Sequence, residues 1–146
     1  MQNRSATTID YDIILKLWEE SVTATHSFVS IKDKQEIKKE IHLYLPHLDV
    51  RLWYVENSFI GFSATNKNHL EMLFLDPGEI GKGYGKQIIR TLIDHFGVTT
   101  VDVNKQNENA KMFYLKSGFS IISEEPTDSE GRPYPILHMK LSKKQR

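Results

Sequence analysis

Apolar residues in the first third of the chain recur at helical spacing, which predicts two amphipathic helices. The first helix is expected to follow an N-cap at Asp10, and its apolar stripe comprises Ile13, Ile14, Leu17, Trp18 and Val22. The second helix is expected to end at Pro46, and its stripe comprises Ile37, Ile41, Tyr44 and Leu45.

From residue 52 the pattern changes to short β-prone runs. Residues 52–56 and 59–65 predict two strands, with Asn57-Ser58 as the hairpin turn between them. A third strand, 70–75, ends before Asp76-Pro77. We expect these three strands to be antiparallel neighbours.

The second half of the chain alternates helices and strands. A helix after Gly85 ends at Gly97, and its stripe comprises Ile88, Ile89, Leu92, Ile93 and Phe96. A strand at 99–103 follows, so strand, helix and strand predict a right-handed βαβ unit with parallel strands. Further along, the pattern predicts a helix at 108–117 and strands at 120–125 and 136–141.

Together these elements predict an α+β fold. We expect a central mixed sheet, mostly antiparallel with one parallel strand pair, flanked by about four helices. The sequence contains no internal repeat and no linker rich in proline, glycine or serine, which favours a single domain over residues 1–146. The basic residues of 142–146 are expected to form a solvated tail.

Composition narrows the classes of function. Of 146 residues, 39% are hydrophobic, while 19 Lys and Arg balance 19 Asp and Glu, which disfavours nucleic acid as a partner. The absence of cysteine excludes disulfides, thiolate metal sites and a cysteine nucleophile, and the six histidines lack metal-ligand spacing, so we expect no metal. Residues 1–10 are polar and no apolar run reaches bilayer length, so we expect a cytoplasmic protein without a membrane partner.

The strongest chemical signal is the glycine-rich segment at 81–85, between a predicted strand and a predicted helix. Its sequence is Gly-Lys-Gly-Tyr-Gly. Glycines permit a tight turn, and the free N–H groups of a helix N-terminus favour a pyrophosphate. Lys86 occupies the third glycine position of a dinucleotide loop, and Gly83 follows Lys82 where a P-loop needs Ser or Thr, so both of those motifs fail. From these residues alone, a phosphate site and a purely structural turn both remain open.

Two segments in order give a more specific signal. Phe74-Leu75-Asp76-Pro77 followed by the segment 81–85 resembles the acetyl-CoA motif of GNAT N-acetyltransferases, which is Val-x-Pro and then Gln/Arg-x-x-Gly-x-Gly/Ala at a helix start. Downstream, Asn107-x-x-Ala-x-x-Phe-Tyr-x-x-x-Gly-Phe119 resembles the second signature of that family. The resemblance covers about residues 52–141 well and the N-terminal helices loosely. It extends to small bacterial members of unassigned substrate that share the segment Gly-Arg-Pro-Tyr-Pro at 131–135.

The resemblance implies transfer of an acetyl group from acetyl-CoA to a primary amine by direct attack in a ternary complex. The residues implied in cofactor binding are Leu73, Phe74, Leu75, Gly81, Lys82, Gly83, Tyr84, Gly85, Lys86 and Asn107. One position departs from the family pattern, because Ile80 stands where the family has Gln or Arg. This loses a side-chain contact to the pyrophosphate, for which Lys82 or Lys86 can compensate.

The same resemblance assigns the acid–base chemistry. Tyr114 matches the general acid that protonates the leaving thiolate. Glu71 is a candidate general base and Asp102 a weaker one, with His69 and His26 as further alternatives. Each carboxylate could instead be a solvated residue on a strand. Tyr114 could instead be a core tyrosine with its hydroxyl at the surface, although Phe113 beside it already fills the core-facing role.

The amine is expected to bind between segments 24–30 and 127–135. His26, Phe28 and Tyr134 are the candidate substrate contacts. A protein N-terminus, a lysine, a polyamine, an amino acid or a drug would each fit as the amine. A non-catalytic acyl-CoA-binding or sensor module is the main alternative function, and an interaction domain without a cofactor is the second. The edge strands predicted at the C-terminus allow a monomer or a homodimer.

Overall fold

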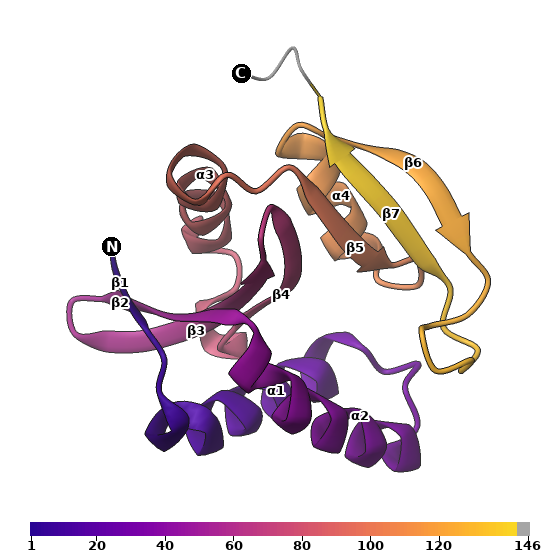
Figure 1. Ribbon diagram of the computed structural model, residues 1–146, viewed down its shortest axis with the longest axis horizontal. Coiled ribbons are helices and arrows are strands. Elements are labelled where there is room, and N and C mark those ends of the chain that lie inside the picture. Colours follow the sequence, from indigo (N-terminus) through magenta and orange to yellow (C-terminus); the bar gives the residue numbers. More distant parts are fainter. Residues whose placement is uncertain (143–146) are drawn as a thin grey trace.

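The computed structural model describes residues 1–142 as helices and strands around one seven-stranded sheet (Figure 1). The strands are β1 Gln2–Ser5, β2 Asp49–Val55, β3 Ser58–Asn66, β4 His69–Leu75, β5 Thr100–Asn104, β6 Phe119–Glu125 and β7 Ile136–Leu141. The α-helices are α1 Tyr11–Thr25, α2 Ile31–Tyr44, α3 Tyr84–Phe96 and α4 Glu108–Lys116. Apart from Ser142, the predicted basic tail lies outside the described residues.

Within residues 1–142 the strand order is β1-β2-β3-β4-β5-β7-β6, and only the β4–β5 pair is parallel. The predicted fold class, a mixed and mostly antiparallel sheet with one parallel pair and four helices, is confirmed. None of the helices within residues 1–142 is both long and apolar enough to cross a lipid bilayer.

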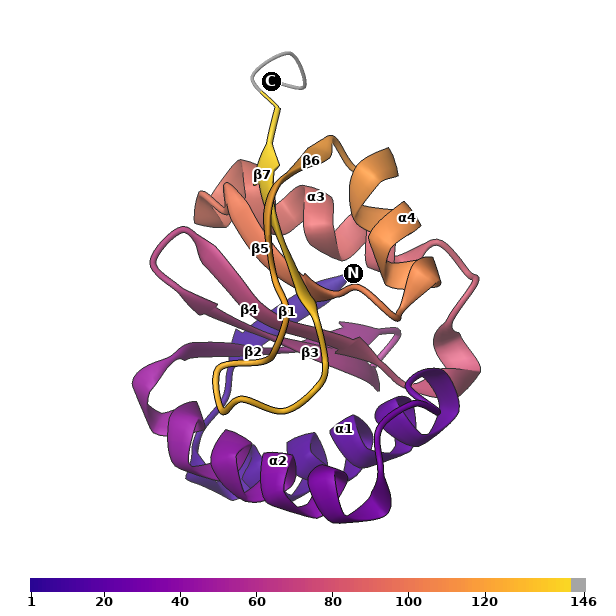
Figure 2. The same cartoon turned by 90° about the vertical axis from the view of Figure 1, so that its right-hand side faces the viewer.

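Two apolar cores hold the helices on opposite faces of the sheet (Figure 2). Helices α1 and α2 bury Ile14, Leu17, Trp18 and Ile41 against side chains of β2, β3 and β4. On the other face, α3 and α4 pack on β4, β5 and β7, where Val101, Val103, Leu137 and Met139 are buried. Side chains alternate across a strand, so the residues between these four point to the face of α1 and α2.

The parallel pair separates soon after it forms. Strands β4 and β5 pair only at His69 with Thr100 and at Leu70 with Val101. On its other edge, β4 continues to pair with β3 as far as Leu75. Along that edge the register skips Glu71, which makes Glu71 the extra residue of a β-bulge. From residue 71 onward the backbone groups of β4 that face β5 therefore have no strand partner.

Several local predictions were wrong. Strand β1 was not predicted, because its residues are polar and an edge strand paired only with β2 needs no apolar pattern. The hairpin turn lies at Glu56-Asn57, where both residues have positive φ, and not at Asn57-Ser58. Asp10 is the N-cap residue of α1, as predicted, but its side chain does not cap the helix. Instead its carboxylate accepts hydrogen bonds from Arg4 and from the backbone N–H of Thr7.

Candidate active site

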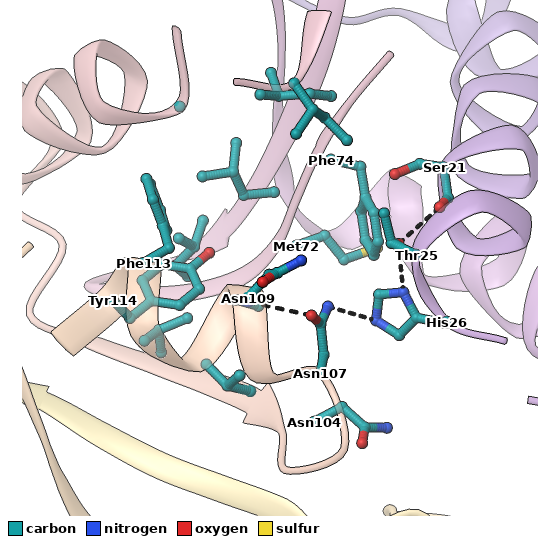
Figure 3. A pocket seen from close by; sticks show the side chains of 18 of the residues that line it. Ser21, Thr25, His26, Met72, Phe74, Asn104, Asn107, Asn109, Phe113 and Tyr114 are labelled. Carbon is teal, nitrogen blue, oxygen red and sulfur yellow. Dashed lines mark hydrogen bonds between the residues drawn. The ribbon is translucent and has the colours of Figure 1, made fainter. Parts of the chain in front are cut away.

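The separation of β4 and β5 opens a cavity of about 500 Å³. Its walls are mainly apolar and come from β4, β5 and α4, and the residues involved include Met72, Leu73, Val103 and Phe113 (Figure 3). Gly81, Gly83, Gly85 and Lys86 line it beside the N-terminus of α3, and Glu71 and Asp102 line it on β4 and β5. The mainly apolar cavity is therefore bordered by a helix N-terminus and by two carboxylates on its strands.

The glycine segment ends in the N-terminus of α3. Gly83 is the N-cap residue, with a φ of 84° that a residue with a Cβ adopts at a cost. No side chain caps the helix and its first turn carries no acidic residue. The first N–H groups are thus free to bind an anion, and the helix dipole favours negative charge there.

Not every residue predicted in this segment lines the cavity. Lys86 does, whereas Lys82 is not among the lining residues and its ammonium lies 3.2 Å from Glu79. Tyr84 packs against the core under α3 and α4. Ile80, half exposed, borders the cavity where the family pattern has Gln or Arg.

The predicted cofactor residues of β4 all line the cavity. The side chains of Leu73 and Leu75 turn to the core under α3 and α4, and that of Phe74 turns to the core over α1 and α2. Since their outer backbone groups have no strand partner, a linear molecule with amide groups can pair with β4 as an added strand.

Tyr114 reaches the cavity from α4. Its ring lies edge-on to Phe113 and Phe119, with centroid distances of 4.9 and 5.8 Å. Tyr114 is 7% exposed and more buried than Phe113, so both residues face the core. Burial raises the pKa of the Tyr114 hydroxyl well above its usual range, so this hydroxyl is protonated at neutral pH.

His26 and Asn107 form a hydrogen-bonded bridge beside the cavity (Figure 3). The Oδ1 atom of Asn107 accepts from the backbone N–H of Ala110, which leaves its Nδ2 group to donate to Nε2 of His26 at 3.2 Å. Thr25 donates to the carbonyl of Ser21 and accepts from Nδ1 of His26 at 2.7 Å. These partners require a neutral imidazole with its proton on Nδ1. Burial lowers the pKa of His26, which also favours the neutral form.

The base candidates lie together on neighbouring strands. Nε2 of His69 lies 3.5 Å from Oε1 of Glu71 and 3.4 Å from Oδ2 of Asp102. The hydrogen bond to Asp102 raises the pKa of His69. Burial opposes the charge of Asp102, but hydrogen bonds from His69 and His138 outweigh it and keep the pKa of Asp102 below its usual range. His138 was not among the candidates, because no motif marks it.

Phe28 and Tyr134 do not line the cavity. The Tyr134 hydroxyl donates to Asp33 of α2 at 2.5 Å and accepts from the backbone N–H of Ser30 at 3.3 Å. The ring of Phe28 lies between those of His26 and Tyr134, with centroid distances of 5.3 and 6.2 Å. Of the three predicted substrate contacts, only His26 borders the cavity. Tyr134 attaches the β6–β7 loop to α2, and Phe28 packs on the Tyr134 ring from the segment before α2.

Arg132 makes the second attachment of this loop. Its side chain is 11% exposed and bonds to Glu40 on α2. One of its guanidinium nitrogens also lies 3.0 Å from Oδ2 of Asp128, while Glu36 and Asp33 are 3.7 and 4.0 Å from the guanidinium. Hydrogen bonding to Glu40 raises the pKa of Arg132 further, so a permanent positive charge is shared by four carboxylates.

Comparison with known proteins identifies this architecture. Residues 16–143 match the family model described as the acetyltransferase (GNAT) domain. The chain belongs to the GNAT family. It is 33% identical over 129 residues to the peptidyl-lysine N-acetyltransferase YjaB of Escherichia coli strain K12, and the alignment covers 86% of each protein. The sequence-based prediction of an acetyl-CoA-dependent acetyltransferase of this family is confirmed.

Solved GNAT structures share the fold. The solution structure of apo-form YjaB from Escherichia coli superposes with a TM-score of 0.86 at 29% identity and covers 95% of both chains. The structure of yncA from Salmonella typhimurium with its cofactor acetyl-CoA has a TM-score of 0.69 at 18% identity and covers 97% of this chain and 93% of that one. The overall fold of this chain is thus one that solved GNAT structures share.

Proposed function

We propose that this acetyltransferase modifies the ε-amino group of a lysine side chain in a peptide or protein, by direct attack of the amine in a ternary complex. The similarity to a peptidyl-lysine N-acetyltransferase supports this class of substrate. The observation that carries the proposal is the cavity between β4 and β5, which joins an anion-binding helix terminus to a pair of carboxylates through apolar walls.

The residues present suit acetyl-CoA. The free N–H groups at the start of α3, with Lys86 beside them, would hold the pyrophosphate. The unpaired edge of β4 at residues 73–75 would pair with the amides of the pantetheine arm, and Asn107 would contact the same arm. Acetyl-CoA supplies the thioester whose C–S bond breaks as the new N–C bond forms.

Acid–base work falls to the side chains on either wall. The Tyr114 hydroxyl, held protonated by burial, gives its proton to the sulfur that leaves. Glu71 and Asp102 place negative charge where a lysine ammonium, with a reference pKa of about 10.4, must bind and lose its proton. A contact between the amine and either Glu71 or Asp102 stays a prediction.

The alternative expected from the sequence, a non-catalytic acyl-CoA-binding module, would bind acetyl-CoA but show no turnover. Ile80 does not favour it, because an apolar side chain where the family has Gln or Arg loses one contact to the pyrophosphate in a module and in an enzyme alike.

The test has two stages. Calorimetric titration with acetyl-CoA, with NAD and ATP as controls, is expected to show saturable binding of acetyl-CoA alone. Release of CoA is then followed with a lysine peptide, with the same peptide carrying acetyl-lysine as the control. Binding without turnover on any amine would support the module, and no binding up to about 1 mM would contradict both readings.

A further inference from the structure

Asp102 lies between two imidazoles on three adjacent strands. Its Oδ1 atom is 2.7 Å from Nδ1 of His138 on β7, and its Oδ2 atom is 3.4 Å from Nε2 of His69 on β4. Val101, Val103, Leu137 and Met139, which flank Asp102 and His138 along their strands, are buried under α3 and α4. Asp102 and His138 therefore point to the opposite face, where both remain about one-third exposed.

The two imidazoles differ in which nitrogen is free. Nε2 of His69 faces two carboxylates, which only accept, and Nδ1 of His69 lies 2.7 Å from the Thr100 hydroxyl. Both nitrogens of His69 are thus engaged. His138 must carry a proton on Nδ1 to bond with Asp102, so its neutral form presents an unprotonated Nε2. That atom is 3.6 Å from Oε1 of Glu125.

The carboxylates are poor proton acceptors for an ammonium at neutral pH. The pKa of Asp102 lies below its usual range, while general base catalysis works best with a pKa near the working pH, as imidazole has. Among residues 1–142, no group of three or more His, Asp and Glu side chains is placed to hold a metal ion, so the cluster is not explained as a metal centre.

We propose that His138 takes the proton from the substrate ammonium through a water on this open face, while Asp102 holds His138 in the tautomer that this step requires. The inference rests on the proposed transfer to an amine. The ammonium N–H bond breaks, the proton arrives on Nε2 of His138 and leaves for solvent from the partly exposed ring, and the amine attacks with the electron pair that remains. Asp102 stays charged and acts as a positioning residue.

The charged groups around His138 lie on β7 itself, on the two strands that pair with it and on β4 beyond β5. They are Asp102 on β5, Glu125 on β6, His69 and Glu71 on β4, and Lys140 on the same face of β7. Three of these five are carboxylates, and the imidazole of His138 lies 2.7 Å from Asp102 and 3.6 Å from Glu125.

The test compares two amines in one variant. His138→Gln keeps an amide that can donate to Asp102 but cannot take up a proton. We expect kcat with a lysine peptide at about pH 7.5 to fall by about 100-fold or more. With 2,2,2-trifluoroethylamine, which is already uncharged at that pH, the loss should be small. His95→Gln, at an exposed position of α3, is the matched control and should match the wild type.

A merely structural role would lower both rates equally, and that result would overturn the proposal, as would an unchanged pH profile. A second measurement needs no activity. Long-range proton–nitrogen NMR should find His138 with its proton on Nδ1 in the wild type, and Asp102→Asn should remove this preference. A proton on Nε2 in the wild type would overturn the proposal.

A wrong substrate class would give a different result from a wrong role of His138. An enzyme that acetylates polyamines or other small amines but no lysine peptide contradicts the proposed function. The same comparison, made with the accepted amine, still decides the role of His138. Acetyl-CoA binding without turnover on any amine would overturn both.

Discussion

The side-chain amide of Asn107 donates to Nε2 of His26 and joins the end of α1 to the start of α4, with 3.2 Å between the two nitrogens. These helices lie on opposite faces of the sheet and belong to its two different cores. The bond therefore links the two halves of the molecule beside the cavity. It exists only while His26 is neutral, because an imidazolium would present a second donor to the Asn107 amide.

Replacing His26 by Phe keeps an aromatic ring next to Phe28 and removes the acceptor. We expect acetyl-CoA to bind about 5-fold more weakly, in line with the loss of one hydrogen bond of about 1 kcal/mol that orients Asn107. His47→Phe, at an exposed site, is the matched control. Calorimetric titration measures both, and equal affinities for the two variants would contradict a role of His26 in holding Asn107.

We also expect His26 to make the free energy of unfolding depend on pH. Burial lowers the pKa of His26, so below about pH 6.5 the unfolded chain takes up a proton that the folded chain resists. The contribution of neutral His26 to the free energy of unfolding is complete above that pH. It is lost as the pH falls toward the pKa of His26 in the folded protein. In urea unfolding, the stability difference between wild type and His26→Phe should be largest near pH 7.5 and should narrow toward about pH 5.5. A constant difference would show that His26 does not titrate in this way.

Tyr114→Phe separates catalysis from packing. The ring contacts with Phe113 and Phe119 remain, so we expect the free energy of unfolding to change by less than about 1 kcal/mol. Loss of the proton donor should lower kcat by about 100-fold or more while acetyl-CoA affinity is kept. Steady-state kinetics and titration test this, and an unchanged kcat would remove Tyr114 from the role of general acid.

Gly83 offers a test of the helix terminus. A Cβ at this position would meet no atom within 4 Å, so any penalty must come from its φ of 84°. Gly83→Val should therefore cost about 1–2 kcal/mol of stability and weaken acetyl-CoA binding by at least about 10-fold. Gly83→Asn, which tolerates a left-handed backbone, is the control for strain. Equal binding by wild type and Gly83→Val would show that the anion does not depend on this turn.

Arg132→Lys tests the attachment of the β6–β7 loop to α2. Lysine keeps the charge but cannot contact Glu40 and Asp128 together, because it lacks the planar guanidinium. Since those carboxylates are partly exposed, we expect a loss of about 1–3 kcal/mol in urea unfolding. Lys105→Gln, which removes an exposed ion pair with Glu124, should cost less than about 1 kcal/mol. Equal losses would mean that the Arg132 cluster adds no particular stability.

The local elements were largely predictable. The strand 136–141 was predicted with its observed bounds, and the helix after Gly85 to within two residues at its start, because each has a strong apolar period and a clear terminating signal. Strand β1 was not predictable in this way, because Gln2 and its neighbours pair with β2 through backbone groups that any residue carries. Its position depends on the edge that β2 offers.

The residues of the candidate site likewise include some that the sequence predicted and some that it misplaced. Gly83, Asn107 and Tyr114 were expected at the site from the resemblance of two motifs to the GNAT family, and all three line the cavity. Phe28 and Tyr134 were expected in the pocket, but they pack on one another because the β6–β7 loop folds onto α2.

By itself, then, the sequence determined the α-helices, most of the strands and the glycine turn before α3, since these follow from short-range periodicity and local backbone geometry, while two motifs in order indicated the family. Only the tertiary structure decided that His69, Asp102 and His138 meet. They lie on β4, β5 and β7, which are neighbours because the sheet places β7 beside β5 and leaves β6 at the outer edge. Such contacts depend on strand register and on which face is buried, and no short stretch of sequence records either.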